Sequence, residues 1–79
     1  MRVETLNSAL LFYTSQGDPN LLVRLHLAGG HKFTGKPCGE SHGMYTIKPT
    51  REDGYGGLIE DTIVVDVADI VAIGIFTVV

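Results

Sequence analysis

Three side chains of types that bind metal ions lie within twelve residues of one another: His31, Cys38 and His42. The Cys38-x-x-x-His42 spacing occurs in zinc sites, which hold the ion through three or four ligands in a tetrahedral arrangement. His26 and Glu40 are the nearest further candidates, and they do not complete a recognised zinc pattern. We therefore expect no metal and no other cofactor.

Cys38 and His42 could also form a thiolate pair for nucleophilic catalysis, with Glu40 supporting the imidazole. A cysteine nucleophile needs a helix N-terminus or a neighbouring cation to stabilise its thiolate. Cys38 instead lies between Pro37 and Gly39 in a predicted loop, with no helix after it. The acidic residues farther along the chain are interpreted as a solvated charge cluster: Glu52, Asp53, Glu60 and Asp61. The sequence thus favours a protein that is not an enzyme.

The glycine-rich stretch from Leu27 to Gly35, LAGGHKFTG, matches neither of the common phosphate-binding loops. One of these needs Gly-Lys-Ser/Thr at the start of a helix, and the dinucleotide fingerprint needs G-x-G-x-x-G between a strand and a helix. Here Phe33 and Thr34 continue as a strand, so the glycines serve the turn of a hairpin. Gly35 within the second strand predicts a bend or a bulge.

The 79 residues predict a single domain, residues 1–79, with a small core. Cys38 is the only cysteine, which fits a reducing compartment, so we expect a cytoplasmic protein. We expect no signal peptide and no membrane span, because the longest apolar run has ten residues and a spanning helix needs about 20. A net charge of −3 predicts no general attraction to nucleic acid, so such a site would have to be local.

A helix is predicted over residues 4–15, because apolar side chains recur there on one helical face: Leu6, Ala9, Leu10 and Tyr13. Gly17 suits the position after the helix, and Pro19 prevents its continuation. Apolar patterns then predict five short strands, over residues 21–27, 31–37, 44–48, 62–67 and 70–78. The connections are predicted as a break at residues 37–43, a glycine-rich loop at 49–57 and a tight turn at 67–69.

The last two predicted strands are apolar on both faces. One small chain cannot bury all of these side chains, and long apolar edge strands pair readily with another chain. The pattern predicts a homo-oligomer joined through these two strands, which head-to-tail contacts would close into a ring. A helix followed by five short strands, the second strongly bent, predicts a mostly β, strongly bent five-stranded barrel with an N-terminal helix.

The turn and the bent strand also carry a family resemblance, through Leu27, Gly30, Phe33 and Gly35. Over about residues 3–79 the chain resembles the Sm/LSm family, whose bent five-stranded barrels form RNA-binding rings and which includes the bacterial host-factor RNA chaperone. The alternative is a different small barrel of the SH3 type. Where the family usually has an Arg-Gly pair between its last two strands, this chain has Val67-Ala68-Asp69.

The resemblance implies an RNA site on the inner rim of the ring, with the candidate residues Ser41, His42, Met44, Tyr45 and Asp69. Tyr45 and His42 would stack a base, Ser41 would form a hydrogen bond to it, and Met44 would pack beneath it. The aspartate and asparagine that read the base in the family are replaced here by Ser41 and Tyr45. The alternative is that Tyr45 is a half-buried strand residue and His42 a solvated loop residue.

A second possible surface is an outer basic patch beside the helix: Arg24, His26, His31 and Lys32. We expect a non-catalytic Sm-like ring that binds single-stranded RNA or another nucleic acid. The alternatives are a structural or protein-interaction homo-oligomer without a nucleotide pocket, and a small enzyme or metal protein that uses Cys38 and His42. The loop at residues 49–57 is either a binding loop or a tolerated insertion.

Overall fold

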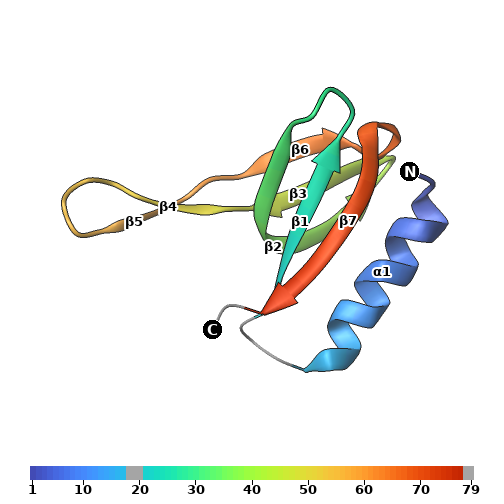
Figure 1. Ribbon diagram of the computed structural model, residues 1–79, viewed down its shortest axis with the longest axis horizontal. Helices are drawn as coiled ribbons and strands as arrows, with labels where there is room; N and C mark the ends of the chain where they lie inside the picture. Colours follow the sequence, from blue (N-terminus) through green and yellow to red (C-terminus); the bar gives the residue numbers. More distant parts are fainter. Residues whose placement is uncertain (18–20, 78–79) are drawn as a thin grey trace.

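The chain begins with a helix that packs on an antiparallel sheet, as a computed structural model shows for residues 1–17 and 21–77 (Figure 1). Helix α1 (Val3–Gln16) confirms the predicted helix, and Leu6 on its predicted apolar face is fully buried. Gly17 follows at a φ of +64°, the left-handed conformation that ends many helices. The expectations for Pro19, for the side chain of Tyr13 and for residue 78 lie outside the described residues.

Five strands form one sheet in the order β6-β3-β2-β1-β7, and every neighbouring pair is antiparallel. Their bounds are Leu21–Leu27 (β1), Lys32–Ser41 (β2), Met44–Lys48 (β3), Ile63–Asp66 (β6) and Ile70–Thr77 (β7). A short 3-10 turn, η1 (Val67–Asp69), joins β6 to β7 where a tight turn is predicted. The mostly β architecture with an N-terminal helix and a five-stranded sheet is confirmed.

Strand β2 continues to Ser41, through the region where the sequence predicts a break. That prediction is wrong because a bulge between Pro37 and Gly39 absorbs the irregularity while the pairing with β3 resumes at Gly39. Gly39 has a φ of +120°, which a residue with a side chain rarely adopts. One long strand therefore replaces the expected short strand and loop.

Gly35 lies where β2 curves, as its position in mid-strand predicts (Figure 1). It is buried and pairs with Val23 of β1. A Cβ atom at this position would lie 2.6 Å from backbone atoms of Lys48 and Pro49, at the end of β3. Only glycine lets the bent strand pass this close to the neighbouring backbone.

The segment with the glycine-rich loop contains a second, two-stranded sheet, so the prediction of a loop without strands is wrong. Strand β4 (Thr50–Glu52) pairs antiparallel with β5 (Leu58–Glu60). The two strands extend the β3–β6 hairpin and project away from the five-stranded sheet on the side opposite α1 (Figure 1). We call this projection, residues 49–61, the arm.

The core lies on the concave side of the bent sheet, between the sheet and α1. Its fully buried side chains come from the helix and from four strands: Leu6, Val23, Leu25, Tyr45, Ile47 and Ile70. Val65 and Val67 join the same cluster, so the two turns beside η1 are fixed to the core as well. None of the helices in residues 1–17 and 21–77 has the length and apolarity to cross a membrane.

Strands β6 and β7 are the two outermost strands of the sheet. Within the described residues each pairs with one neighbour only, β6 with β3 and β7 with β1, and the two do not pair with each other. The sheet is therefore bent and open. Val64 on β6 and Val71 on β7 remain 54% and 64% exposed, so apolar side chains stay in water at both edges.

Candidate nucleic-acid interface

Three turns meet at one end of the sheet, which we call the turn end: the β1–β2 turn, the β2–β3 turn and η1. The Val67 amide donates to the Gly43 carbonyl at 2.9 Å, and the Ala28 amide donates to the Asp69 carbonyl at 2.8 Å. The amino group of Met1 donates to the Val67 carbonyl at 3.1 Å. The predicted proximity of the 40–46 loop and the 67–69 turn is thus confirmed.

The β2–β3 connection is a two-residue turn formed by His42 and Gly43. Ser41 pairs with Met44, and the φ values of +52° at His42 and +81° at Gly43 match a type I′ hairpin. The Glu40 carboxylate accepts a hydrogen bond from the Gly43 amide at 2.8 Å. The turn thus presents the His42 side chain to solvent.

The rim site predicted from the family resemblance is only partly assembled at the turn end. Ser41, His42 and Asp69 are exposed, and Met44 is 41% exposed. Tyr45 is fully buried in the core, so its predicted stacking role is wrong, and so is the alternative that it is half-buried. Period-two alternation in β3 places Tyr45 on the same face as Ile47, which is also fully buried.

The structure gathers cations elsewhere, on the outward face of β1 and β2. The register pairs Arg24 with Thr34 and His26 with Lys32, on the opposite side of the sheet from Val23 and Leu25. We call this surface the cationic face, with the outward residues Arg24, His26, Lys32, Thr34 and Lys36. It contains three members of the predicted outer patch and faces away from α1 rather than lying beside it. His31, the fourth member, is exposed just before β2.

Arg24 is held in place on the cationic face by two neighbours. Its Nε donates to the Thr34 hydroxyl at 3.1 Å, and its guanidinium carbon lies 4.9 Å from the centre of the Phe76 ring. This contact with β7 is a cation–π interaction. It places an aromatic ring and a planar cation side by side on a solvent-facing surface, an arrangement that suits stacking and phosphate contacts.

Acidic residues are absent from β1, β7 and residues 32–36 of β2 within the described chain. The cations outside the cationic face behave differently, because Lys48 pairs with Glu60 at 3.9 Å and Arg51 with Asp61 at 3.0 Å. Charge is therefore segregated in a protein whose net charge is −3. A polyanion would meet uncompensated cations on this one face.

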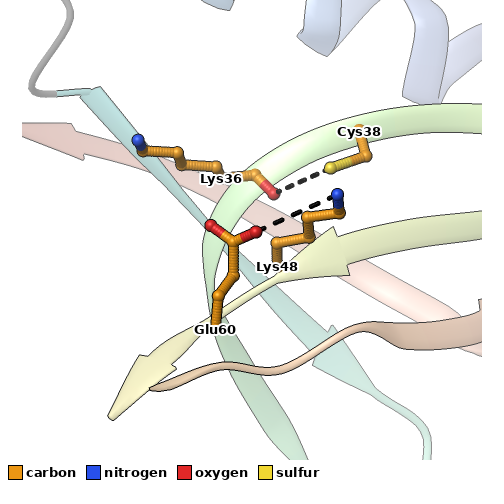
Figure 2. A network of polar contacts seen from close by, with 4 residues as sticks. All are labelled: Lys36, Cys38, Lys48 and Glu60. Atoms are coloured by element: carbon orange, nitrogen blue, oxygen red, sulfur yellow. Dashed lines mark hydrogen bonds and ion pairs between the residues drawn. The ribbon is translucent and has the colours of Figure 1, made fainter. Parts of the chain in front are cut away.

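The residues considered for metal binding and catalysis are not gathered into a site. In the part of the chain that the structure describes, no three His, Cys, Asp or Glu side chains lie close enough to hold one metal ion. Cys38 is exposed, and its thiol lies 3.9 Å from the Lys36 carbonyl, next to the Lys48–Glu60 pair at the base of the arm (Figure 2).

The tip of the arm is an ordered feature that the sequence prediction missed. The Asp53 carboxylate accepts hydrogen bonds from the amides of Tyr55 at 2.7 Å and Gly57 at 3.0 Å. These two donors lower the pKa of Asp53 below its ordinary value. Gly54 has a positive φ, which glycine adopts freely. The Asp-Gly pair, a frequent turn signal, was the available clue.

Comparison with protein-family models, with curated proteins and with solved structures finds no match for this chain.

Proposed function

We propose that this chain is a non-catalytic, Sm-like protein whose copies join head-to-tail through β6 and β7 into a ring and bind single-stranded RNA or a similar nucleic acid. The observation that carries the proposal is the pair of unpaired strand edges at the two ends of one bent sheet. Such edges expose rows of unpaired backbone N–H and C=O groups that another strand can satisfy.

Pairing between unlike edges accounts for the arrangement better than pairing between like edges. A dimer joined through two β6 strands would leave both β7 edges and Val71 in water, and a β7 dimer would leave Val64 there. Pairing of β6 with the β7 of the next copy satisfies both edges in every copy. Repetition of that contact closes a ring when the rotation between copies divides a full turn.

The cationic face is the proposed nucleic-acid site, in place of the rim. Arg24, Lys32 and Lys36 supply three charges for phosphates in each copy, and Phe76 beside Arg24 supplies a ring on which a base can stack. Stacking on an aromatic side chain contributes about 1–3 kcal/mol per base. A ring repeats this face once per copy, so a weak contact in one copy is multiplied along a strand.

The second candidate function is a structural or protein-interaction ring. It is favoured by the turn end, where Tyr45 is buried and where Asp66 and Asp69 are exposed. Two carboxylates repel phosphate, so the rim by itself suits a protein partner better than a nucleic acid.

Assembly is tested with Val64→Lys and Val71→Lys, each of which places a charge on one exposed edge strand. Both side chains are more than half exposed, so the fold of the single chain should persist. Analytical ultracentrifugation should show a ring for the natural chain and smaller species for both variants. Leu11→Lys is the control, because Leu11 is 72% exposed on α1, away from both edges. A natural chain that sediments as a monomer at micromolar concentration would refute the ring.

Nucleic-acid binding is tested by fluorescence anisotropy with short U-rich, A-rich and mixed RNA and DNA strands at two salt concentrations. Lys32→Gln should weaken binding and reduce the salt dependence by about 0.7 in the logarithmic slope per lost phosphate contact. Arg2→Gln removes the same charge outside the cationic face and should leave binding unchanged. Equal effects of the two changes would remove the cationic face as the site, and no binding by the natural chain would favour the protein-interaction ring.

A further inference from the structure

The arm is a stiff projection rather than an irregular loop. Its strands pair at Thr50↔Glu60 and Glu52↔Leu58, and the Asp61 amide donates to the Pro49 carbonyl at 2.9 Å at its base. The Arg51–Asp61 ion pair, with 3.0 Å between nitrogen and oxygen, links its two strands. The arm is therefore built to hold a fixed direction away from the sheet (Figure 1).

The arm exposes apolar side chains that its own chain does not cover. Tyr55 at the tip is 95% exposed and Leu58 on β5 is 75% exposed. The Asp53 carboxylate holds the tip in a fixed shape, so the Tyr55 side chain is presented from an ordered backbone. An ordered projection with a bare aromatic tip has the features of a contact element.

The charge of the arm decides which partner it fits. Residues 49–61 contain four carboxylates and one guanidinium, so the arm is strongly acidic and would repel a nucleic acid. The complementary surface present in the structure is the cationic face, which carries Arg24, Lys32 and Lys36 without an acidic neighbour in β1 or residues 32–36 of β2. The arm points away from the sheet of its own chain, so the cationic face that it can meet belongs to another copy (Figure 1).

We propose that the arm of one copy docks on the cationic face of a second copy, with its carboxylates facing Arg24 and Lys32 and its Tyr55 tip packed against that face. Glu52 is exposed and belongs to no ion pair of the described residues, so its charge is free for this contact. The docking uses neither the β6 nor the β7 edge. It therefore adds a second kind of contact between copies to the proposed ring.

The test uses the absence of tryptophan from the chain, which makes Tyr55→Trp a unique fluorescent probe at the arm tip. Emission should move to shorter wavelength as the protein concentration rises, because the ring leaves water on docking. Glu52→Lys and Lys32→Glu, each in the Tyr55→Trp chain, should weaken the association roughly threefold to tenfold by charge repulsion. The two changes together should restore it, since they exchange the partners of one charge pair.

Three results would overturn the docking. The first is emission that stays at the solvent-exposed wavelength at all concentrations, and the second is a shift that neither charge reversal changes. The third is a shift that appears only when RNA is added, which would assign the tip to nucleic acid. The shift should persist when Val64→Lys and Val71→Lys disrupt the edges. Its loss there would place the tip in the β6–β7 contact instead, whereas failure of the ring alone leaves the shift intact.

Discussion

Substitution of Gly35 by alanine tests the bend of β2, because the added Cβ has no space. The new atom would lie 2.6 Å from the carbonyl carbon and oxygen of Lys48 and from the nitrogen of Pro49. Ordinary contacts between non-bonded carbon atoms are about 3.5–4.0 Å, so the two segments must separate by about 1 Å. These obstacles are backbone atoms, which cannot rotate away as the end of a side chain can.

The cost follows from what the separation would break. Movement of Lys48 and Pro49 disturbs the Lys36↔Lys48 pairing and the 2.9 Å hydrogen bond from the Asp61 amide to the Pro49 carbonyl. Each lost hydrogen bond costs about 1 kcal/mol, and overpacking of a buried site costs about 1–3 kcal/mol. We expect Gly35→Ala to lower the free energy of unfolding by about 3 kcal/mol. For a chain of this length that corresponds to a decrease in Tm of roughly 12–24 °C.

The assay is thermal and urea unfolding followed by circular dichroism, at one fixed protein concentration because association shifts the apparent Tm. Gly74→Ala is the matched control: Gly74 also pairs with β1, and the nearest atoms to its added Cβ are the Cβ and the carbonyl oxygen of Arg24, both at 3.9 Å. That is an ordinary contact, so Gly74→Ala should raise the free energy of unfolding by about 0.5 kcal/mol. Equal Tm values for the Gly35→Ala and natural chains would refute the close approach of β2 to the end of β3.

Tyr45→Ala should lower the free energy of unfolding by about 3–5 kcal/mol, because it removes a fully buried aromatic side chain; denaturant unfolding measures this, and a loss below 1 kcal/mol would contradict the core position. His42→Gly should raise the free energy of unfolding by about 0.5–1 kcal/mol, because His42 has a φ of +52°; thermal unfolding would show no gain if the turn were of another type. The lowered pKa of Asp53 means that its hydrogen bonds to Tyr55 and Gly57 persist above the ordinary aspartate pKa and are lost as the pH falls through the lower, folded-state pKa. An NMR titration should therefore show the amide signals of Tyr55 and Gly57 shifting at a lower pH than an unfolded aspartate titrates; a midpoint at or above the ordinary value would contradict the contacts.

Local periodicity predicts the elements whose character depends on their own residues. The helical spacing of Leu6 and Leu10 predicts α1, and the alternation of Val23 and Leu25 with Arg24 predicts which face of β1 is buried. The turn at residues 67–69 follows from the interruption between two apolar runs. These features need no knowledge of the register between strands.

The features that depend on distant pairing are the ones that periodicity misses. The strand character of residues 37–41 and of the arm appears only when a partner strand supplies hydrogen bonds, because Pro37, Gly39 and the arm glycines favour turns locally. The cationic face needs the β1–β2 register, which brings Lys32 opposite His26. The burial of Tyr45 was readable from its alternation with Ile47, and the family resemblance obscured it.

The position of β1 between β2 and β7 has a consequence for the order in which the molecule folds. Strand β2 follows β1 after a short turn, so the β1–β2 hairpin can form early and at little loop-closure cost. Strand β7 is the last strand of the chain and pairs with β1 along most of its length, from Leu21 to Leu27. The central strand therefore keeps one open edge until nearly the whole chain has been synthesised. We expect folding to be slow for a chain of this size, and the waiting β1 edge to be the point at which incomplete chains aggregate.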